Sequence, residues 1–249
     1  MRDVFAKARC FDCELVSHNL ALPVSMKVLM VQVRIWDLPT RLFHWGLVLC
    51  VCGLVITGNL GGNAMQWHFR FGYCVLTLLL FRVVWGVVGG FWSRWSQLPI
   101  SPLRVWAYLQ GRDRFTQFAG HNPLGSWSVL AFLLILFLQV GTGLISDDEI
   151  ANMGPLSSLA SGQWVALATS WHKGWGKTTL IVLVCIHLLA LVWYRWRRNQ
   201  ALVPSMWHGD KSMPDPVVSS ADHGRSRALA LALISVSAMA VFGIVSMGS

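Results

Sequence analysis

Acidic residues are scarce in this sequence, and so is charge of either sign. Only 11 Asp and Glu occur in 249 residues, and Asp, Glu, Lys and Arg together make up 12% of the chain, whereas soluble domains carry about 25%. This composition excludes an ordinary soluble domain. Instead, 55% of the residues are hydrophobic, and several runs reach the roughly 20 residues that cross a bilayer as a helix. The sequence therefore predicts a mostly helical integral membrane protein.

The excess of basic residues does not indicate a nucleic-acid partner. The net charge of +9 comes from 20 Lys and Arg, and in a membrane protein such residues gather in cytoplasmic loops. We therefore expect membrane lipid around the chain and no nucleic acid bound to it.

Complete zinc and c-type haem motifs are also missing. Cys10 and Cys13 form a lone CxxC with no second pair to complete a zinc site, and Glu14 stands where a c-type haem motif needs His. Residues 1–30 contain no apolar run of the kind found in secretory signals. We interpret 1–30 as an N-terminal extension and expect the biological start at Met26.

Five stretches are long and apolar enough to span a membrane. The predicted spans are 42–60, 68–90, 124–145, 175–196 and 228–248. The predicted fold is an all-α membrane protein, with a four-helix transmembrane domain over 31–211, a polar linker over 212–227 and a fifth, C-terminal transmembrane helix within 228–249. A short interfacial helix is expected near 102–111.

The orientation follows from the loop charges. The segment before the first span carries Arg34 and Arg41, the 91–120 loop is basic, and the exit of the fourth span carries Arg195, Arg197 and Arg198, whereas the other two loops have few basic residues. Basic loops stay in the cytoplasm. We therefore expect a multi-pass protein with a cytoplasmic N-terminus and a C-terminus outside.

Four histidines are expected at two depths. His44 and His187 belong to the cytoplasmic half, whereas His68 and His172 belong to the outer ends of their spans. His172 and His187 are 15 residues apart, which is about 22 Å along a helix with both rings on a similar side. Ionisable residues inside spans indicate function. For His68 and His172, which lie at span ends, a packing or interfacial role remains the alternative.

Paired histidines suit haem better than zinc. Zinc needs a third or fourth ligand at the same level, and the predicted spans contain no Asp or Glu. Haem iron needs only two axial ligands, and two histidines leave no open position, which favours electron transfer. Glycines that fit a flat ring occur at positions 46, 53, 58, 72, 174 and 176. The alternative is that these glycines serve helix contacts.

Arginines at the same depths are candidate partners for haem propionates. Arg82 follows His68 by 14 residues, about 21 Å inward along a helix, and so belongs near the inner pair. Its alternative is to snorkel to the interface. Arg41 and Arg70 lie beside the inner and outer levels. His121, in GHNPLG, is interpreted as part of a helix start capped by Asn122, with a quinone pocket as the alternative.

These stretches resemble a known family. WDLPTRLFHW, FRVVWGVVGG, GHNPLG and the WH…H of the fourth span are similar to the bacterial cytochrome b561 and nickel–iron-hydrogenase b-type cytochrome family, over about 31–211. The resemblance implies a four-helix haem-binding bundle in the bacterial inner membrane with two haem b groups. It implies His44 with His187 as ligands of the inner haem iron, and His68 with His172 as ligands of the outer one.

Two features depart from the family pattern. Lys173 stands where relatives usually have an acidic residue, and His172 and His187 are one residue further apart than usual. These departures predict either an irregular helix start or a displaced His172.

The predicted function is electron transfer across the inner membrane, between the quinone pool and a periplasmic partner such as a cytochrome c or a hydrogenase. The resemblance leaves open a membrane-anchor b subunit of a nickel–iron hydrogenase or another complex, and a quinol-linked oxidoreductase that acts alone. Rivals of another class are a haem-free, His-lined metal transporter and a purely structural anchor. No inverted repeat and no pair of Gly/Pro-broken helices is present to favour the transporter.

Overall fold

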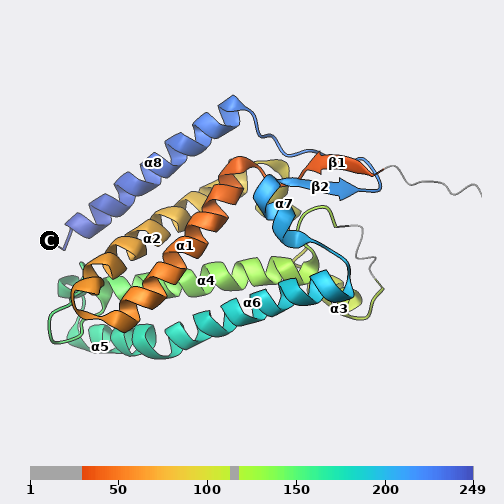
Figure 1. Ribbon diagram of the computed structural model, residues 1–249. Coiled ribbons are helices and arrows are strands. Elements are labelled where there is room, and N and C mark those ends of the chain that lie inside the picture. The colour runs from red at the N-terminus through yellow and green to blue at the C-terminus, as the bar shows by residue number, and fades with distance from the viewer. Residues whose placement is uncertain (1–29, 113–117, 249) are drawn as a thin grey trace, which may run out of the picture.

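The computed structural model describes residues 30–112 and 118–248. The expected start at Met26 and the CxxC of Cys10 and Cys13 lie outside the described residues. Five apolar helices are long enough to cross a membrane: α1 (Leu38–Leu60), α2 (Met65–Val88), α4 (Pro123–Ile145), the helix over Gly162–Arg197, and α8 (Gly224–Ser246) (Figure 1). The prediction of a helical, multi-pass membrane protein with a fifth C-terminal span is confirmed.

The remaining elements are short. They are β1 (Val31–Arg34), the 3-10 turns η1 (Gly62–Ala64), η2 (Phe91–Ser93), η3 (Trp95–Gln97) and η5 (Ser157–Leu159), the helices α3 (Pro102–Leu109) and α7 (Leu202–His208), and β2 (Asp210–Met213). Helix α3 coincides with the interfacial helix expected near 102–111.

The fourth span starts earlier than predicted. The sequence suggested a start near Trp175, but the helix begins at Gly162 and runs as α5 (Gly162–Trp171), a π-helical segment η6 (His172–Gly176) and α6 (Lys177–Arg197) without a break. The polar and glycine-rich HKGWGK stretch looks like a helix boundary, yet it continues the helix through a wider turn. His172 is therefore inside the helix rather than at its start.

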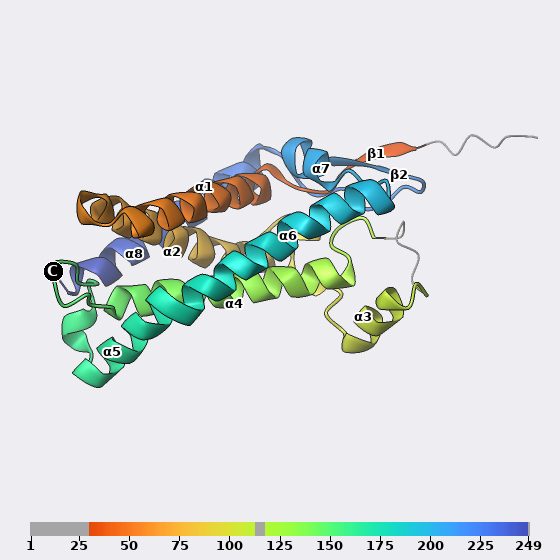
Figure 2. The same cartoon turned by 60° about the horizontal axis from the view of Figure 1, so that its bottom comes forward.

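The long helices form two groups that face one another (Figure 2). Helix α1 packs along α2, which also contacts α8 and α4, and α4 packs along α6. The main core cluster lies between these helices and includes Val75, Leu79, Leu136, Leu180 and Val241. We call the end of the bundle that holds Gly61, between α1 and α2, the outer end, and the end that holds Asp37 the inner end.

Asp37 links two helices at the inner end. Its side chain is fully buried and caps α1 by accepting a hydrogen bond from Thr40 N at 2.8 Å. The same carboxylate accepts from Gly90 N at 3.0 Å, from Ser93 Oγ at 2.9 Å and from Trp85 Nε1 at 3.3 Å. These donors belong to the end of α2 and the turn after it. One carboxylate thus ties the start of α1 to the end of α2.

A two-stranded sheet closes the inner end, and the sequence did not predict it. Strands β1 and β2 pair antiparallel, with Val31 opposite Met213 and Arg34 opposite Asp210. The expected polar linker over 212–227 begins within β2 and is fixed to the N-terminal part of the domain. Asp222 accepts a hydrogen bond from Arg34 at 2.7 Å and also pairs with Arg227 at 3.0 Å. The linker therefore positions α8 against α2.

Candidate functional site

The outer histidines approach one another from two helices. His68 comes from the first turn of α2 and His172 from the start of η6, and their ring centroids are 6.0 Å apart with the planes at 84°. A metal ion between two imidazoles needs a nitrogen at about 2.0 Å on each side. The separation of the two rings fits that requirement.

Hydrogen bonds fix the tautomer of both outer rings. His68 Nδ1 lies 3.1 Å from Leu54 O, and His172 Nδ1 lies 2.8 Å from Gln139 O. A carbonyl oxygen only accepts, so each Nδ1 carries the proton and donates it. The Nε2 lone pair of each ring is then free to bind a metal. Backbone carbonyls of α1 and α4 thus orient both rings.

Two glycines make room for these rings. A Cβ at position 58 would lie 3.0 Å from the His68 ring, and one at position 143 would lie 2.8 Å from His172 Cε1. Of the six glycines expected to border a flat group, only Gly58 borders a histidine. Gly53 faces Phe71, and Gly176 faces Gln139 and Trp171, so these two serve helix packing. The sequence reading missed Gly143 and Gln139.

The long His172–His187 spacing predicted an irregular helix start; the irregularity is present as η6, but it lies inside the helix rather than at its start. A π-helical turn holds one more residue than an α-helical turn, so it absorbs the extra residue while His172 still reaches His68. Gln139 Nε2 donates to His172 O at 2.8 Å, which satisfies a backbone acceptor of this wider turn. Lys173 is exposed and borders a surface cavity of about 550 Å³ that also holds Asp147, Asp148 and Glu149.

This geometry predicts opposite results for two changes in length. Deletion of Gly174, which is exposed and has no neighbour within 4 Å of an added Cβ, should turn η6 into an α-helical turn and keep the haem that the resemblance predicts between His68 and His172. Insertion of one alanine after Val182 should rotate His172 by about 100° relative to His187. This rotation should abolish haem binding between His68 and His172. The haem content per purified chain and the absorption spectrum are measured for both variants. Equal haem content in the two variants would contradict the role assigned to η6.

The inner histidines also come from opposing helices. His44 lies on α1 and His187 on α6. The ring of Phe132, on α4, packs edge-on against His187 at 5.8 Å, and Trp45 packs edge-on against His44 at 5.1 Å. His44 Nδ1 is buried and has no hydrogen-bond partner among the described residues.

Arg82 is buried within the chain rather than exposed at its surface, which argues against the snorkelling alternative. Its side chain is buried, with the residue 4% exposed, and its guanidinium lies 4.2 Å from the centroid of the Trp95 ring, which covers it. Within the described chain, Nη1 is buried and finds no acceptor. A buried guanidinium in a membrane protein is normally paired. The free Nη1 therefore fits an anionic group that the chain itself does not supply.

His121 also lies at the inner end, where its ring packs against Trp36 with the centroids 4.7 Å apart. Burial lowers the pKa of His121 to about 3, and the positive charges of Arg82 and Lys211 add to this effect. His121 is therefore neutral at physiological pH. The expected helix start is confirmed, because Asn122 caps α4 by accepting from Gly125 N at 2.7 Å and Pro123 occupies the first turn.

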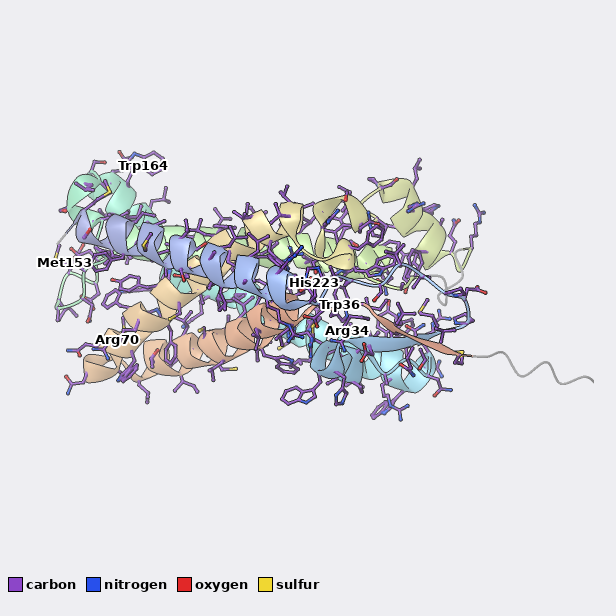
Figure 3. The ribbon with its side chains drawn as sticks, turned by 90° about the horizontal axis from the view of Figure 1, so that it is seen from above. Arg34, Trp36, Arg70, Met153, Trp164 and His223 are labelled. Atoms are coloured by element: carbon purple, nitrogen blue, oxygen red, sulfur yellow. The ribbon has the colours of Figure 1, made fainter. Side chains whose placement is uncertain are left out.

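The other two candidate arginines differ in their surroundings. Arg41 donates to Trp207 O at 2.8 Å and lies 3.7 Å from Asp222, while its Nε is buried and unpartnered within the described residues. Arg70 is exposed at the outer end (Figure 3), and its guanidinium lies 4.8 Å from the Trp67 ring. The structure thus pairs Arg70 with Trp67 rather than with either outer histidine.

A histidine pair that meets across two membrane helices, as His68 and His172 do, is typical of a b-type cytochrome. Among the described residues, no three His, Cys, Asp or Glu side chains converge on one point. The family model of prokaryotic cytochrome b561 matches residues 35–209. The chain belongs to this family. It is a multi-pass membrane cytochrome that transfers electrons, and its b-type character implies haem b.

The relatives share one description. The chain is similar to probable Ni/Fe-hydrogenase B-type cytochrome subunits from Cupriavidus necator (25% identical over 217 residues, 73% of this chain and 87% of the relative) and Azotobacter chroococcum (27% over 217 residues, 74% and 90%). It is also similar to the probable Ni/Fe-hydrogenase 1 B-type cytochrome subunit of Escherichia coli (28% over 148 residues, 48% and 62%). No solved structure matches the chain. Helix α8 lies outside residues 35–209, which the family model matches.

Proposed function

We propose that the chain holds two haem b groups and carries electrons across the bacterial inner membrane between the quinone pool and a redox partner outside. The observation that carries this proposal is the outer pair, where His68 and His172 are 6.0 Å apart and both present a free Nε2. The inner pair, His44 and His187, uses the same long helix about 22 Å further along.

The residues present fit haem b at both levels. His68 and His172 would hold the outer iron, and His44 and His187 the inner one. The unpartnered Nη1 of Arg82 would bind an inner propionate, with Arg41 as a second cation at this level, whereas Arg70 would have to leave Trp67 to serve the outer group. When bound with two histidine ligands, haem b supplies one-electron transfer at an iron with no open position.

The protein's own contribution is to orient the rings and to exclude water. The carbonyls of Leu54 and Gln139 hold the outer imidazoles in one tautomer. Phe132 and Trp45 hold the inner rings edge-on. The apolar core around Leu79 and Leu136 keeps the region between the two levels dry.

A hydrogenase-type protein is the proposed partner, because the relatives are described as hydrogenase b-type subunits. In that assembly the chain would act as the membrane-anchor b subunit and pass electrons to quinone. A periplasmic cytochrome c remains the second candidate partner. The basic inner-end segments around Arg34 and Arg41 support a cytoplasmic N-terminus and a C-terminus outside.

One preparation tests the proposal. The full chain with a C-terminal alkaline phosphatase is expressed in a bacterial inner membrane, and haem is counted by pyridine haemochrome. We expect about two haems b per chain, reduction of both on addition of quinol, and an active phosphatase. A chain without haem would leave only a metal transporter or a structural anchor, and an inactive phosphatase would reverse the orientation.

A further inference from the structure

A second site lies at the inner end, between the end of α2 and the start of α8. A cavity of about 240 Å³ is bordered there by Arg94, His223 and Arg225, together with the apolar side chains of Trp85, Val88 and Leu229. Figure 3 looks down on α8 and shows His223 where the linker passes into this helix. This cavity is separate from both histidine pairs, and α8 lies outside the family match.

The charged side chains that border the cavity are arginines. Arg94 and Arg225 are exposed, and neither belongs to an ion pair among the described residues. Arg94 uses only its Nε, which donates to Gly89 O at 3.0 Å. The neighbouring Asp222 does not cancel this charge, because it is engaged by Arg34 and Arg227. No carboxylate borders the cavity.

The cavity lies at the level where two membrane spans end. Helix α2 ends at Val88 and α8 begins at Gly224, so the cavity belongs to the headgroup region. Its apolar border reaches the surface, because Val88 is 45% exposed and Leu229 is 44% exposed. A ligand with a phosphate in the cavity could therefore run its hydrocarbon along α2 and α8.

The volume admits a headgroup but not a whole lipid. A cavity of about 240 Å³ suits a phosphate with part of a glycerol. Basic pockets between membrane helices bind anionic headgroups. We propose that this cavity binds the phosphodiester of an anionic phospholipid, which bridges α2 and α8 and helps to hold the fifth helix on the bundle.

The test compares three forms of the full chain. They are the wild type, the double variant Arg94→Gln/Arg225→Gln, and the control Arg104→Gln/Arg112→Gln, which removes two exposed charges of the same loop without touching the cavity. Each is purified in mild detergent and titrated with phosphatidylglycerol or phosphatidylcholine, and bound lipid is counted by native mass spectrometry. Haem content verifies that each variant is folded.

We expect one phosphatidylglycerol to bind tightly to the wild type and the control, and roughly tenfold weaker binding in the double variant. Arg225→Gln alone, at an exposed position, should give an intermediate loss. Phosphatidylcholine should bind weakly to all forms, and millimolar inorganic phosphate should not displace the lipid. Equal binding by the double variant, or equal affinity for the two lipids, would overturn the proposal. Displacement by inorganic phosphate would identify free phosphate as the ligand instead.

Discussion

Replacement of His187 by alanine is expected to remove the inner haem and leave the outer one, so that haem per chain falls by about half. His187 is the α6 half of the inner pair, and its ring is held by Phe132 at 5.8 Å. Cys185 is exposed and faces elsewhere on the helix. Among the residues that the structure describes, no other His or Cys is placed to replace His187 as a ligand. The outer pair uses different contacts, through Leu54 and Gln139, and should be unaffected.

The matched control is His208→Ala, which makes the same chemical change at an exposed position on α7. Pyridine haemochrome gives the haem content, and a redox titration shows whether one midpoint or two remain. His68→Ala should give the reciprocal result and leave the inner haem. If His187→Ala retained two haems with unchanged midpoints, the inner ligand assignment would be wrong, whatever the fate of the outer site.

Depth along a helix could be predicted from the sequence, because the rise per residue is fixed. The 15 residues between His172 and His187 set two levels whatever the surroundings. That is why the sequence placed His68 with His172, and the structure brings these two rings together. Cap chemistry was equally local, as the Asn122 cap of α4 shows.

Other features depended on contacts that are distant in the sequence. Strand β1 is four residues long and its partner begins at Asp210, so neither strand carries a periodic signal of its own. The pairing becomes clear only from the Arg34–Asp210 contact. The start of the fourth span was misplaced because HKGWGK resembles a helix boundary, whereas η6 continues the helix.

The supporting residues of the outer site were missed for a similar reason. Gln139 is a polar residue inside an apolar run, which is itself a signal of function in a membrane helix. Its backbone carbonyl, however, is what binds His172 Nδ1, and no side-chain pattern reveals a carbonyl. In the sequence, Gly143 looks like any glycine at a helix contact. In the structure, a Cβ at this position would lie 2.8 Å from His172 Cε1.

Asp37→Ala is expected to destabilise the chain by about 3–5 kcal/mol, because a buried hydrogen-bonded charge is removed and its donors are left without acceptors. The donors are Thr40 N, Gly90 N, Ser93 Oγ and Trp85 Nε1. For a domain of this size that loss lowers the Tm by roughly 10 °C. Asp37→Asn should lower the stability by nearly as much. One carboxylate oxygen that accepts hydrogen bonds is replaced by an amide nitrogen, which only donates.

The pattern of haem release separates this role from a general loss of stability. His44 follows Asp37 by about two helical turns, and Arg82 lies one turn before Trp85, so the buried carboxylate positions both helices of the inner site. On heating, the Asp37→Ala chain should therefore release the inner haem before the outer one. Absorption spectra and near-UV circular dichroism measure this release. The control is Asp215→Ala, which removes an exposed carboxylate from the linker. Simultaneous release of both haems would show that Asp37 supports the whole bundle rather than its inner end.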